Sequence, residues 1–511
     1  MDNKFCILLI QPHAGMAGAF VRHAPLSLLY ASTEAVKQGI PVVLLDLRLH
    51  STDWQQAVRA ALKPNMLVGI SVMTGYPVQH ALEVGDFVKS VAPHTPVVWG
   101  GPFATFHPEY ILRDAKSCDY VISGYGSRPL AALAKALKEH ARPSGIPGLS
   151  YRTSVGEVLE PADWSCHEMI HWRDIPYHLI YDYSVYGQLD QKRIIFSMYS
   201  AMGCAYQCAF CSSPPLYRQI KGRRWVPLPV QDIADHIEHV VDAYDADYIY
   251  FIDDDSFVDI NHVAAIIKEI KKRGIHVGLG FRGARVNEIL RMDSAYIDAL
   301  AAAGTDILHI GAETASDRLL RLVRKDCTVA DILEINRKLA HHPQLFLFYN
   351  FIIGLPTETM DDLKALGRLW LTLVEEHPRC IIGTPNMLRP LPGTELFAML
   401  VEMYGYAPPQ HLLDYAKAEV ENEAYAAPWM SADCARYANM LRVTSYFVDD
   451  KFNKVTEQKT LRSRAFGFLF KLYTPIARWR LRHGYADFFV EGYLYALGER
   501  LLRGKSNLLG V

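Results

Sequence analysis

Three cysteines are spaced closely enough to bind one metal cluster. They lie in the segment Cys204-Ala-Tyr-Gln-Cys208-Ala-Phe-Cys211, a C-x3-C-x2-C pattern. Thiolates are the usual ligands of a 4Fe–4S cluster, and three thiolates leave one iron without a protein ligand. An open coordination position distinguishes a catalytic metal site from a structural one. The alternative, a zinc knuckle, needs a fourth Cys or His, and residues 212–231 contain neither. The pattern therefore predicts a redox enzyme.

The composition is that of an ordinary globular protein with more than one hydrophobic core. The chain has 511 residues, 50% of them hydrophobic, and a net charge of −2, which predicts two to four domains. The near-neutral charge argues against nucleic acid as a partner, because phosphate binding needs a basic surface. The other six cysteines are scattered singly, which favours a reducing, cytoplasmic compartment. We expect no membrane span, since no run of 18 apolar residues is present.

The first part of the chain alternates strand and helix patterns. Strands are predicted at 5–10, 41–47, 67–72, 96–99 and 120–123, and helices at 26–38, 53–61, 77–91 and 128–140. This alternation predicts an α/β fold with a doubly wound parallel sheet. Gly75, Gly100, Gly101 and Gly124 follow successive strands. Glycines there let the backbone approach a large ligand at the carboxyl edge of the sheet, although ordinary turns also use them.

A second βα series follows a connector that includes a small predicted hairpin at 148–159. Its strands are predicted at 193–199, 248–253, 276–281, 307–310, 345–353 and 381–387. Six such units predict a partial (β/α)6 barrel of the TIM type, with its site at the carboxyl ends of the strands. Beyond residue 392 the pattern is helical and aromatic. We therefore expect four parts: a domain at 1–145, a connector at 146–190, a barrel at 191–400 and a helical C-terminal domain at 401–511.

Polar residues recur where the strands of the second series are predicted to end. Asp253 and Asp254 follow the second strand, Arg285 the third and Glu313 the fourth. At the end of a barrel strand, such residues are typical of ligand contacts. Helix capping is the alternative for Asp254 and for Thr314 and Thr357, which are good N-cap types. Glu313 is harder to explain as a cap, since a carboxylate at the end of an apolar strand needs a partner.

These motifs resemble those of a known superfamily. The cysteine loop with Phe210 before its last cysteine resembles the radical S-adenosylmethionine (SAM) superfamily, as do Gly-x-Glu-Thr at 311–314 and Gly-Leu-Pro-x-Glu-Thr at 354–359. Ser71-Val-Met-Thr74-Gly75, Val97-Val-Trp-Gly100-Gly101 and Pro108-Glu109 resemble its cobalamin-binding branch. That branch includes the anaerobic magnesium-protoporphyrin cyclase and the phosphorus methylases. The resemblance covers residues 4–400.

The resemblance implies three cofactors: a 4Fe–4S cluster, SAM and cobalamin. In the superfamily, SAM chelates the open iron and is split by one electron from the cluster. By motif position, the cluster ligands are Cys204, Cys208 and Cys211. SAM contacts are implied for Phe210, Asp253, Asp254, Arg285, Gly311, Glu313 and Gly354. Cobalamin contacts are implied for Ser71, Thr74, Gly75, Gly100, Gly101 and Gly124.

The chain departs from related patterns at two places. The Asp-x-His-x-x-Gly motif, whose His binds cobalt in methionine synthase-like proteins, has no match near Asp46 because His50 is displaced. The radical branch generally lacks this ligand too. In Gly124-Tyr-Gly126, a tyrosine stands where relatives carry an acid, which puts the contacts to the tail of cobalamin in doubt.

The resemblance predicts a cobalamin-dependent radical SAM methyltransferase that acts on an unactivated carbon or phosphorus of a small-molecule, lipid or pigment substrate. One alternative is an oxidative or cyclising enzyme of the porphyrin-cyclase type, and another is a regulatory protein that binds cobalamin and an iron–sulfur cluster. An electron donor such as flavodoxin or ferredoxin is expected as a partner.

The C-terminal region at 462–511 is basic and aromatic. It has nine Lys or Arg residues between 462 and 505 against three acids, with aromatic residues interleaved. A region of this kind can rest on an anionic membrane surface. The alternative is a helical lid packed on the barrel with its charged face in water.

Overall fold

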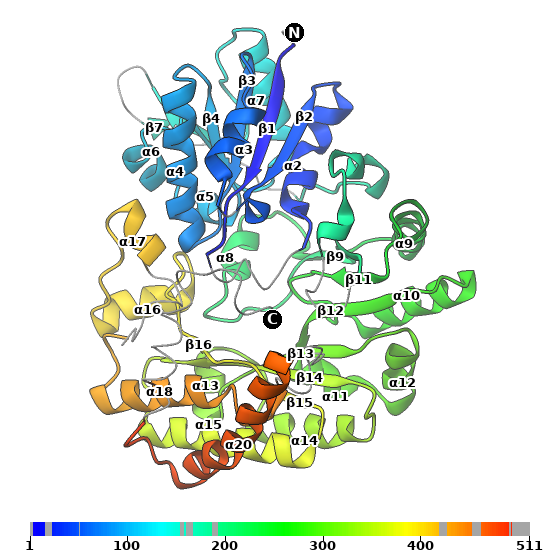
Figure 1. The fold of residues 1–511 in the computed structure, drawn as a ribbon, viewed down its shortest axis with the longest axis vertical. Helices are drawn as coiled ribbons and strands as arrows, with labels where there is room; N and C mark the ends of the chain where they lie inside the picture. The colour runs from blue at the N-terminus through cyan, green and yellow to red at the C-terminus, as the bar shows by residue number, and fades with distance from the viewer. Residues whose placement is uncertain are drawn as a thin grey trace. The chain divides into compact units, whose positions relative to one another are not determined.

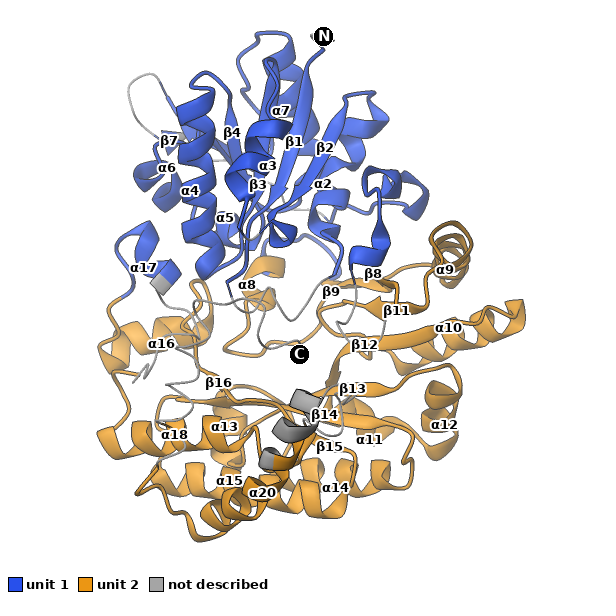
Figure 2. Cartoon of the chain, in the orientation of Figure 1, with its two compact units in different colours: residues 1–188, 218–223, 408–419 blue, residues 189–217, 224–407, 420–511 orange. Residues whose placement is uncertain are grey.

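The chain folds into two compact units (Figure 1, Figure 2). The computed structural model describes residues 4–15, 23–50, 52–153, 158–159, 167–186, 193–417, 427–451, 461–489 and 492. The first unit comprises residues 1–188, 218–223 and 408–419, and the second comprises 189–217, 224–407 and 420–511. No helix among the described residues is long and apolar enough to cross a bilayer.

The first unit contains a seven-stranded sheet with the order β2-β1-β3-β4-β5-β6-β7. Its parallel strands are β1 (Cys6–Gln11), β2 (Val42–Asp46), β3 (Met66–Ser71), β4 (Val97–Gly100) and β5 (Tyr120–Ile122). The predicted hairpin, β6 (Leu149–Arg152) and β7 (Val158–Leu159), extends this sheet antiparallel to β5. Because β1 lies between β2 and β3, the strand order reverses there, which creates a ligand-binding switch point at the carboxyl edge.

Helices cover both faces of this sheet, as a doubly wound fold requires. One face packs against α2 (Leu26–Lys37) and α7 (Ser127–Lys138). The other packs against α3 (Trp54–Ala61), α4 (Tyr76–Val91), α5 (Pro102–Phe106) and α6 (Pro108–Asp114). The strands are therefore buried on both faces and consist mostly of Val, Ile and Leu. Helix α17 (Leu412–Lys417), which is far away in sequence, packs on α4 and α6 and adds Leu412 and Tyr415 to that core.

The second unit is built on another seven-stranded, curved sheet. Strands β15-β14-β13-β12-β11-β8 are neighbours in this order, and β16 pairs with β14. Their bounds are β8 (Ile195–Met198), β11 (Tyr248–Phe251), β12 (Gly278–Arg285), β13 (Ile307–Glu313), β14 (Phe346–Ile353), β15 (Cys380–Ile382) and β16 (Asn386–Met387). All the paired strands are parallel. A small ribbon of β9 (Ala201–Gly203) and β10 (Trp225–Pro227) precedes β11.

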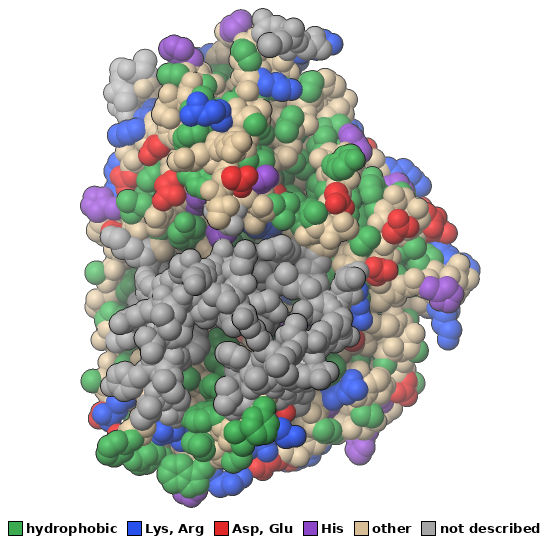
Figure 3. Space-filling view, viewed as in Figure 1, with side chains coloured by type: hydrophobic (Ala, Val, Ile, Leu, Met, Phe, Trp, Pro, Cys, Tyr) green, Lys and Arg blue, Asp and Glu red, His purple; other side chains and the backbone are tan. Residues whose placement is uncertain are grey.

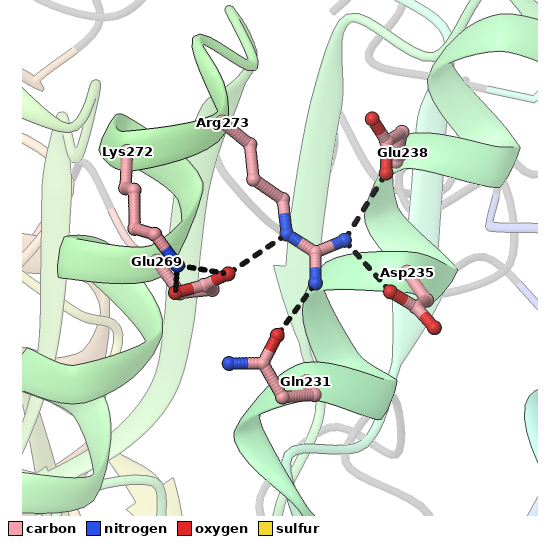
Figure 4. A network of polar contacts seen from close by, with 6 residues as sticks. All are labelled: Gln231, Asp235, Glu238, Glu269, Lys272 and Arg273. Atoms are coloured by element: carbon pink, nitrogen blue, oxygen red, sulfur yellow. Dashed lines mark hydrogen bonds and ion pairs between the residues drawn. The ribbon is translucent and has the colours of Figure 1, made fainter.

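Helices lie along the outside of this partial barrel (Figure 1). They are α9 (Val230–Tyr244), α10 (Ile260–Arg273), α11 (Val286–Arg291), α12 (Ser294–Ala302), α13 (Asp317–Leu322), α14 (Val329–Ala340) and α15 (Met360–Glu376), while α8 (Ser213–Arg218) directly follows the cysteine loop. The helical region after the sheet contributes α16 (Glu395–Tyr404), α18 (Ala432–Thr444) and α20 (Leu461–His483). Arg273 joins α9 to α10, because its guanidinium bonds Glu269 of its own helix and Gln231, Asp235 and Glu238 of the other (Figure 4).

The fold class predicted from the sequence is confirmed, both for the doubly wound sheet and for the partial barrel. The strand ends differ slightly, because β12 runs on to Arg285 and β13 to Glu313. These two polar residues are therefore held by strand pairing rather than by loops. The short helices α5 and α6 were not predicted, since both begin at a proline within a turn-like segment. The four-part domain division stays a prediction.

Candidate active site

A cavity of about 380 Å³ opens at the inner face of the second unit's sheet. Its lining comes from the cysteine loop, from the residues at and just beyond the ends of β11, β12 and β13, and from side chains within β11 to β14. Eight of the ten residues predicted on this sheet line it together: Cys204, Cys208, Phe210, Cys211, Asp254, Arg285, Gly311 and Glu313. The strand ends thus bring together residues that are distant in sequence.

The cysteine loop is tied to the unit through its backbone. Gly203, at φ +83°, turns the chain immediately before Cys204, a conformation that glycine adopts without strain. The Ala209 amide donates to Val323 O at 3.1 Å, and Ala209 O accepts from Leu396 N at 2.9 Å. The Cys211 amide closes a tight turn onto Cys208 O at 3.2 Å. The loop is therefore held in place by neighbouring segments, and its three thiols line one cavity.

Two of the three thiols lie in partly buried surroundings that disfavour their thiolate form unless a cation is bound. Burial raises the pKa of Cys204 to about 12 and raises the pKa of Cys211 above its ordinary value, so both remain neutral without a bound cation. Metal binding deprotonates thiols. No three His, Cys, Asp or Glu side chains within the described ranges are arranged to hold a single metal ion. The donor set of three thiols along one cavity wall fits a multinuclear iron–sulfur cluster.

Arg285 connects the cysteine loop to the end of β12. Its Nη1 donates to Cys208 Sγ at 2.9 Å and its Nη2 donates to Lys325 O. The guanidinium lies 3.8 Å above the ring of Tyr206, a distance at which cation–π attraction is strong. Arg285 is 4% exposed, and its Nε has no hydrogen-bond partner among the described residues. A buried cation on a cysteine sulfur stabilises a thiolate there and so fits the predicted cluster.

Glu313 and Lys325 form a buried ion pair beside the cavity. Lys325 Nζ donates to Glu313 Oε1 at 2.7 Å, with side chains only 7% and 8% exposed. Gly311 makes room for them, since a Cβ there would come within 2.6 Å of both Glu313 Oε1 and Lys325 Nζ. Glu313 has φ +63°, and the register with β14 shifts between Gly311 and Glu313. The Gly-x-Glu spacing is thus explained by a bulge that turns this carboxylate into the cavity.

Two acidic residues after β11 behave differently. Asp253 is fully buried, accepts hydrogen bonds from Ser200 and Ala201, and does not line the cavity. Burial raises the pKa of Asp253 to about 6. Asp254 does line the cavity and accepts hydrogen bonds from Ser213 Oγ at 3.2 Å and from Tyr217 OH. Asp253 therefore holds the start of β9 in position, while Asp254 faces the cavity.

Gly354 is the second predicted residue that does not line the cavity. Its amide donates to Glu358 Oε2 at 2.6 Å and its carbonyl accepts from Trp429 Nε1 at 2.8 Å. At φ +81°, a Cβ would also meet Met387 Cε at 3.1 Å. Burial raises the pKa of Glu358 to about 8. In this structure the Gly-Leu-Pro-x-Glu-Thr segment therefore closes a turn at the end of β14.

Several residues that line the cavity were not predicted as site residues from the sequence. Asp255, one position beyond Asp254, also lines the cavity, and burial together with Glu288 raises its pKa well above the usual range. Glu288, fully buried, accepts from Tyr206 OH at 2.6 Å. Lys325 lies in a loop and carried no motif. Four others lie within strands: Tyr250, Arg282, His309 and Asn350. The alternation of side chains along a strand is the sequence pattern that could have identified these four as facing the cavity.

The residues predicted for cobalamin lie at the carboxyl edge of the first sheet. Ser71 ends β3, Thr74 and Gly75 lead into α4, Gly100 ends β4, and Gly101 and Gly124 follow β4 and β5. At Gly101, with φ +97°, a Cβ would come within 3.0 Å of Val72 N and O, whereas at Gly100 the nearest atom would be 4.0 Å away. Gly101 thus forms a tight turn, while the backbone at Gly100 has space beside it. This combination at the switch-point edge fits a large ligand that lies against the backbone.

His50 lies apart from this role. Its Nδ1 is 3.4 Å from Asp53 Oδ1, and its side chain is 37% exposed. Asp46, in the same segment, binds Arg48 through two hydrogen bonds at 2.9 and 2.6 Å and accepts another from Tyr186 OH at 3.1 Å. The segment that differs from the cobalt-binding motif is therefore organised by these internal polar contacts.

Two family models match the chain. The radical SAM superfamily model matches residues 198–369, and the B12 binding domain model matches residues 13–134. The first covers the cysteine loop and most of the second sheet, and the second covers the strand edge that carries the glycines. The matched regions therefore coincide with the two sites described above.

Curated and solved proteins are similar to this chain. An uncharacterised methyltransferase of Pyrococcus horikoshii is 27% identical over 65% of this chain and 68% of its own length. The anaerobic magnesium-protoporphyrin IX monomethyl ester cyclase of Rubrivivax gelatinosus is 25% identical over 60% of this chain, and the match spans about half (54%) of the cyclase. The radical SAM methyltransferase TsrM of Kitasatospora setae, solved with cobalamin and a 4Fe–4S cluster, has the same fold, with a TM-score of 0.66, 18% identity and coverage of 94% and 99%.

Proposed function

Because the chain belongs to the cobalamin-binding radical SAM enzymes, we propose that it is a cobalamin-dependent methyltransferase that acts on an unactivated carbon, or phosphorus, of a small molecule. The observation that carries the proposal is the set of three thiols on the wall of one cavity that also presents Asp254, Asp255 and Glu313. When bound, the cluster, SAM and cobalamin supply one-electron reduction, hydrogen abstraction and methyl transfer, chemistry that protein side chains lack.

The residues of the chain have the following roles in this proposal. Cys204, Cys208 and Cys211 bind the cluster, and Arg285 offsets the negative charge that develops on Cys208. SAM carries a sulfonium and an ammonium, so the carboxylates of Asp254 and Glu313 complement its charge. Lys325 holds Glu313 in one orientation by the bond at 2.7 Å, which positions the free oxygen of this carboxylate before a ligand arrives.

The predicted contact of Arg285 with SAM is modified by its contacts within the protein. Two of its nitrogens already bond Cys208 Sγ and Lys325 O. We therefore assign Arg285 to the cluster rather than to SAM. Phe210 lines the cavity next to Cys211 and gives this part of the wall an apolar ring.

A test without the unknown substrate is available. Protein reconstituted with cluster and cobalamin is incubated with reductant and SAM labelled with deuterium in its methyl group. We expect label in the cobalamin fraction and 5′-deoxyadenosine in the supernatant, both measured by mass spectrometry, and neither when reductant is omitted. 5′-Deoxyadenosine without label on cobalamin would favour the non-methylating, cyclase-type alternative. Absence of both products would favour a regulatory binding protein.

The partner is a small molecule, and two further partners are proposed: an electron donor such as flavodoxin or ferredoxin, and a membrane surface. The exposed side chains of helix α20 support the proposed membrane surface. Phe468, Leu472, Ile476 and Trp479 recur at helical spacing and are 47–63% exposed, whereas Ala477 and Leu481 on the opposite face are buried. Residues 461–483 include six Lys or Arg and no acid. At the lower end of the view, where Figure 1 draws α20, Figure 3 shows hydrophobic and basic side chains together with some acidic ones.

A helix with such a face binds anionic lipid surfaces. We expect Leu472→Ser combined with Trp479→Ser to lower co-sedimentation with phosphatidylserine-containing vesicles severalfold, because it removes apolar area that inserts between headgroups. Leu49→Ser, at a residue 38% exposed in the first unit, is the matched control. Unchanged co-sedimentation would favour the lid alternative. Most of the predicted segment beyond residue 489 lies outside the described residues.

A further inference from the structure

Four successive strands of the second sheet each place a polar side chain in the cavity at a position before the strand ends. Tyr250 comes from β11, Arg282 from β12, His309 from β13 and Asn350 from β14. On β13 and β14 the alternation is clear, since Leu308, Ile310, Tyr349 and Phe351 are buried in the core while His309 and Asn350 are half-buried. The inner face of this barrel therefore carries a polar layer.

Such a layer is unusual for a barrel interior. Inward positions of barrel strands are normally filled by packed Val, Ile and Leu, whereas here His309 and Asn350 are half-buried and Arg282 is exposed along the cavity. The side chains of Arg282, His309 and Asn350 form no hydrogen bond or ion pair with any residue that the structure describes, and none of their polar atoms is sealed from the cavity. Three polar side chains without a partner among the described residues, Arg282, His309 and Asn350, around one cavity indicate a ligand that pairs with them.

The charges in the cavity identify what kind of ligand group fits. Three cations line it, and two are already engaged: Arg285 with Cys208 and Lys325 with Glu313. Arg282 has no carboxylate partner in the described part of the chain. His309 beside it is neutral, since burial and the Arg282 charge lower its pKa, so it can donate one hydrogen bond and accept another. Arg282 is thus the cation left to bind an anionic group.

Two lining residues, Tyr250 and His309, present rings to this subsite, and Phe348, which does not line the cavity, packs against His309. The rings of Tyr250 and His309 meet edge to face, 6.4 Å apart, and the Phe348 ring is 5.1 Å from His309 on its other side. Gly280 permits this arrangement, because a Cβ there would come within 2.5 Å of Tyr248 OH and 2.8 Å of Tyr250 Cδ2. A planar, partly apolar body beside an anionic group matches such a surface.

We propose that Arg282, His309 and Asn350 form the subsite for an oxyanion of the methyl acceptor, a carboxylate or a phosphate attached to a planar body. The inference rests on the proposed function, which makes this cavity the place of reaction. The guanidinium of Arg282 binds two oxygens of the anion in parallel, and the Asn350 amide and the His309 ring donate to the same group. The carboxylate of SAM is the competing source of such an anion.

The test uses the reconstituted holoenzyme and two probes of the same shape, benzoate and benzamide. Saturation-transfer NMR titrations measure the affinity of each. We expect Arg282→Gln to weaken benzoate about tenfold or more, the loss of one charge-assisted pair, and to leave benzamide unchanged. Arg282→Lys should lie between, since it keeps the charge but loses the planar fork. Arg337→Gln, which breaks an ion pair with Glu376 on the surface, is the matched control.

A second measurement separates the two sources of the anion. The change in the EPR spectrum of the reduced cluster on addition of SAM should be the same in Arg282→Gln as in the unmodified protein. Loss of that change would place Arg282 at SAM and overturn the inference. Equal benzoate affinity in both proteins, or no benzoate binding at all, would also overturn it. If label transfer to cobalamin fails while benzoate binding still depends on Arg282, the proposed function falls and the anion subsite stands.

Discussion

Replacement of Cys208 by alanine is expected to leave the protein without its cluster and to reduce 5′-deoxyadenosine formation to background. The three thiols line one cavity, and no fourth cysteine among the described residues lines it. Cys208 is also the thiol that receives the Arg285 hydrogen bond at 2.9 Å. With two thiolates left, an iron–sulfur cube loses a ligand and Arg285 loses its buried acceptor. Iron and sulfide content after anaerobic reconstitution, with the EPR spectrum after reduction, measures the loss.

Cys434→Ala provides the matched control for this experiment. Cys434 is 7% exposed near the start of α18 and does not line the cavity, so its iron content should equal that of the unmodified protein. A Cys208→Ala protein with full iron content would contradict the assignment of the cysteine loop. An equal loss in both variants would point instead to a general effect of removing a buried thiol.

Lys325→Met is expected to lower the free energy of unfolding by about 3–5 kcal/mol, the usual cost of leaving one partner of a buried ion pair unpaired. The side chains of Lys325 and Glu313 are 7% and 8% exposed, and their atoms are 2.7 Å apart. Removal of the ammonium leaves the Glu313 carboxylate in a site that solvent barely reaches. Thermal and urea unfolding of the apoprotein measure the difference. The same variant should also weaken SAM binding, because the carboxylate loses its fixed orientation.

The double variant Glu313→Gln, Lys325→Met separates charge imbalance from lost packing. It should recover most of the stability lost in Lys325→Met, since no unpaired charge remains. Arg337→Gln breaks an ion pair with side chains 60% and 29% exposed and should cost less than about 1 kcal/mol. A single variant that costs no more than this surface control would contradict the buried pair.

The contribution of the Lys325–Glu313 pair to the free energy of unfolding should change with pH in a definite direction. Burial lowers the pKa of Lys325, but Glu313 and Cys208 raise it, and the net direction is upward. A cation whose pKa is raised by folding stabilises the protein below its unfolded-state pKa and stops doing so as the pH rises through the folded-state pKa. The stability difference between Lys325→Met and the unmodified protein should therefore stay constant at neutral pH and narrow only at strongly alkaline pH.

The amino-acid sequence by itself determined the cysteine loop and the order of the elements. The three cysteines lie within eight residues, so they are close together in space whatever the fold of the rest of the chain. The βα periodicity is likewise local, and it placed the strands of both sheets within a few residues of their observed bounds. Glu313 was recognised because a carboxylate at the end of an apolar strand requires a partner.

Only the tertiary structure decided which polar residues face the cavity and what holds them. Asp253 and Asp254 are adjacent in the loop after β11, yet Asp253 accepts hydrogen bonds from Ser200 in the core while Asp254 lines the cavity, because the partners that each carboxylate meets come from segments distant in sequence. Lys325 contacts Glu313, and Arg285 contacts Cys208, although the two members of each pair lie on different strands or loops. The polar layer of Arg282, His309 and Asn350 depends on strand register, which is set by the pairing of whole strands and not by any local pattern.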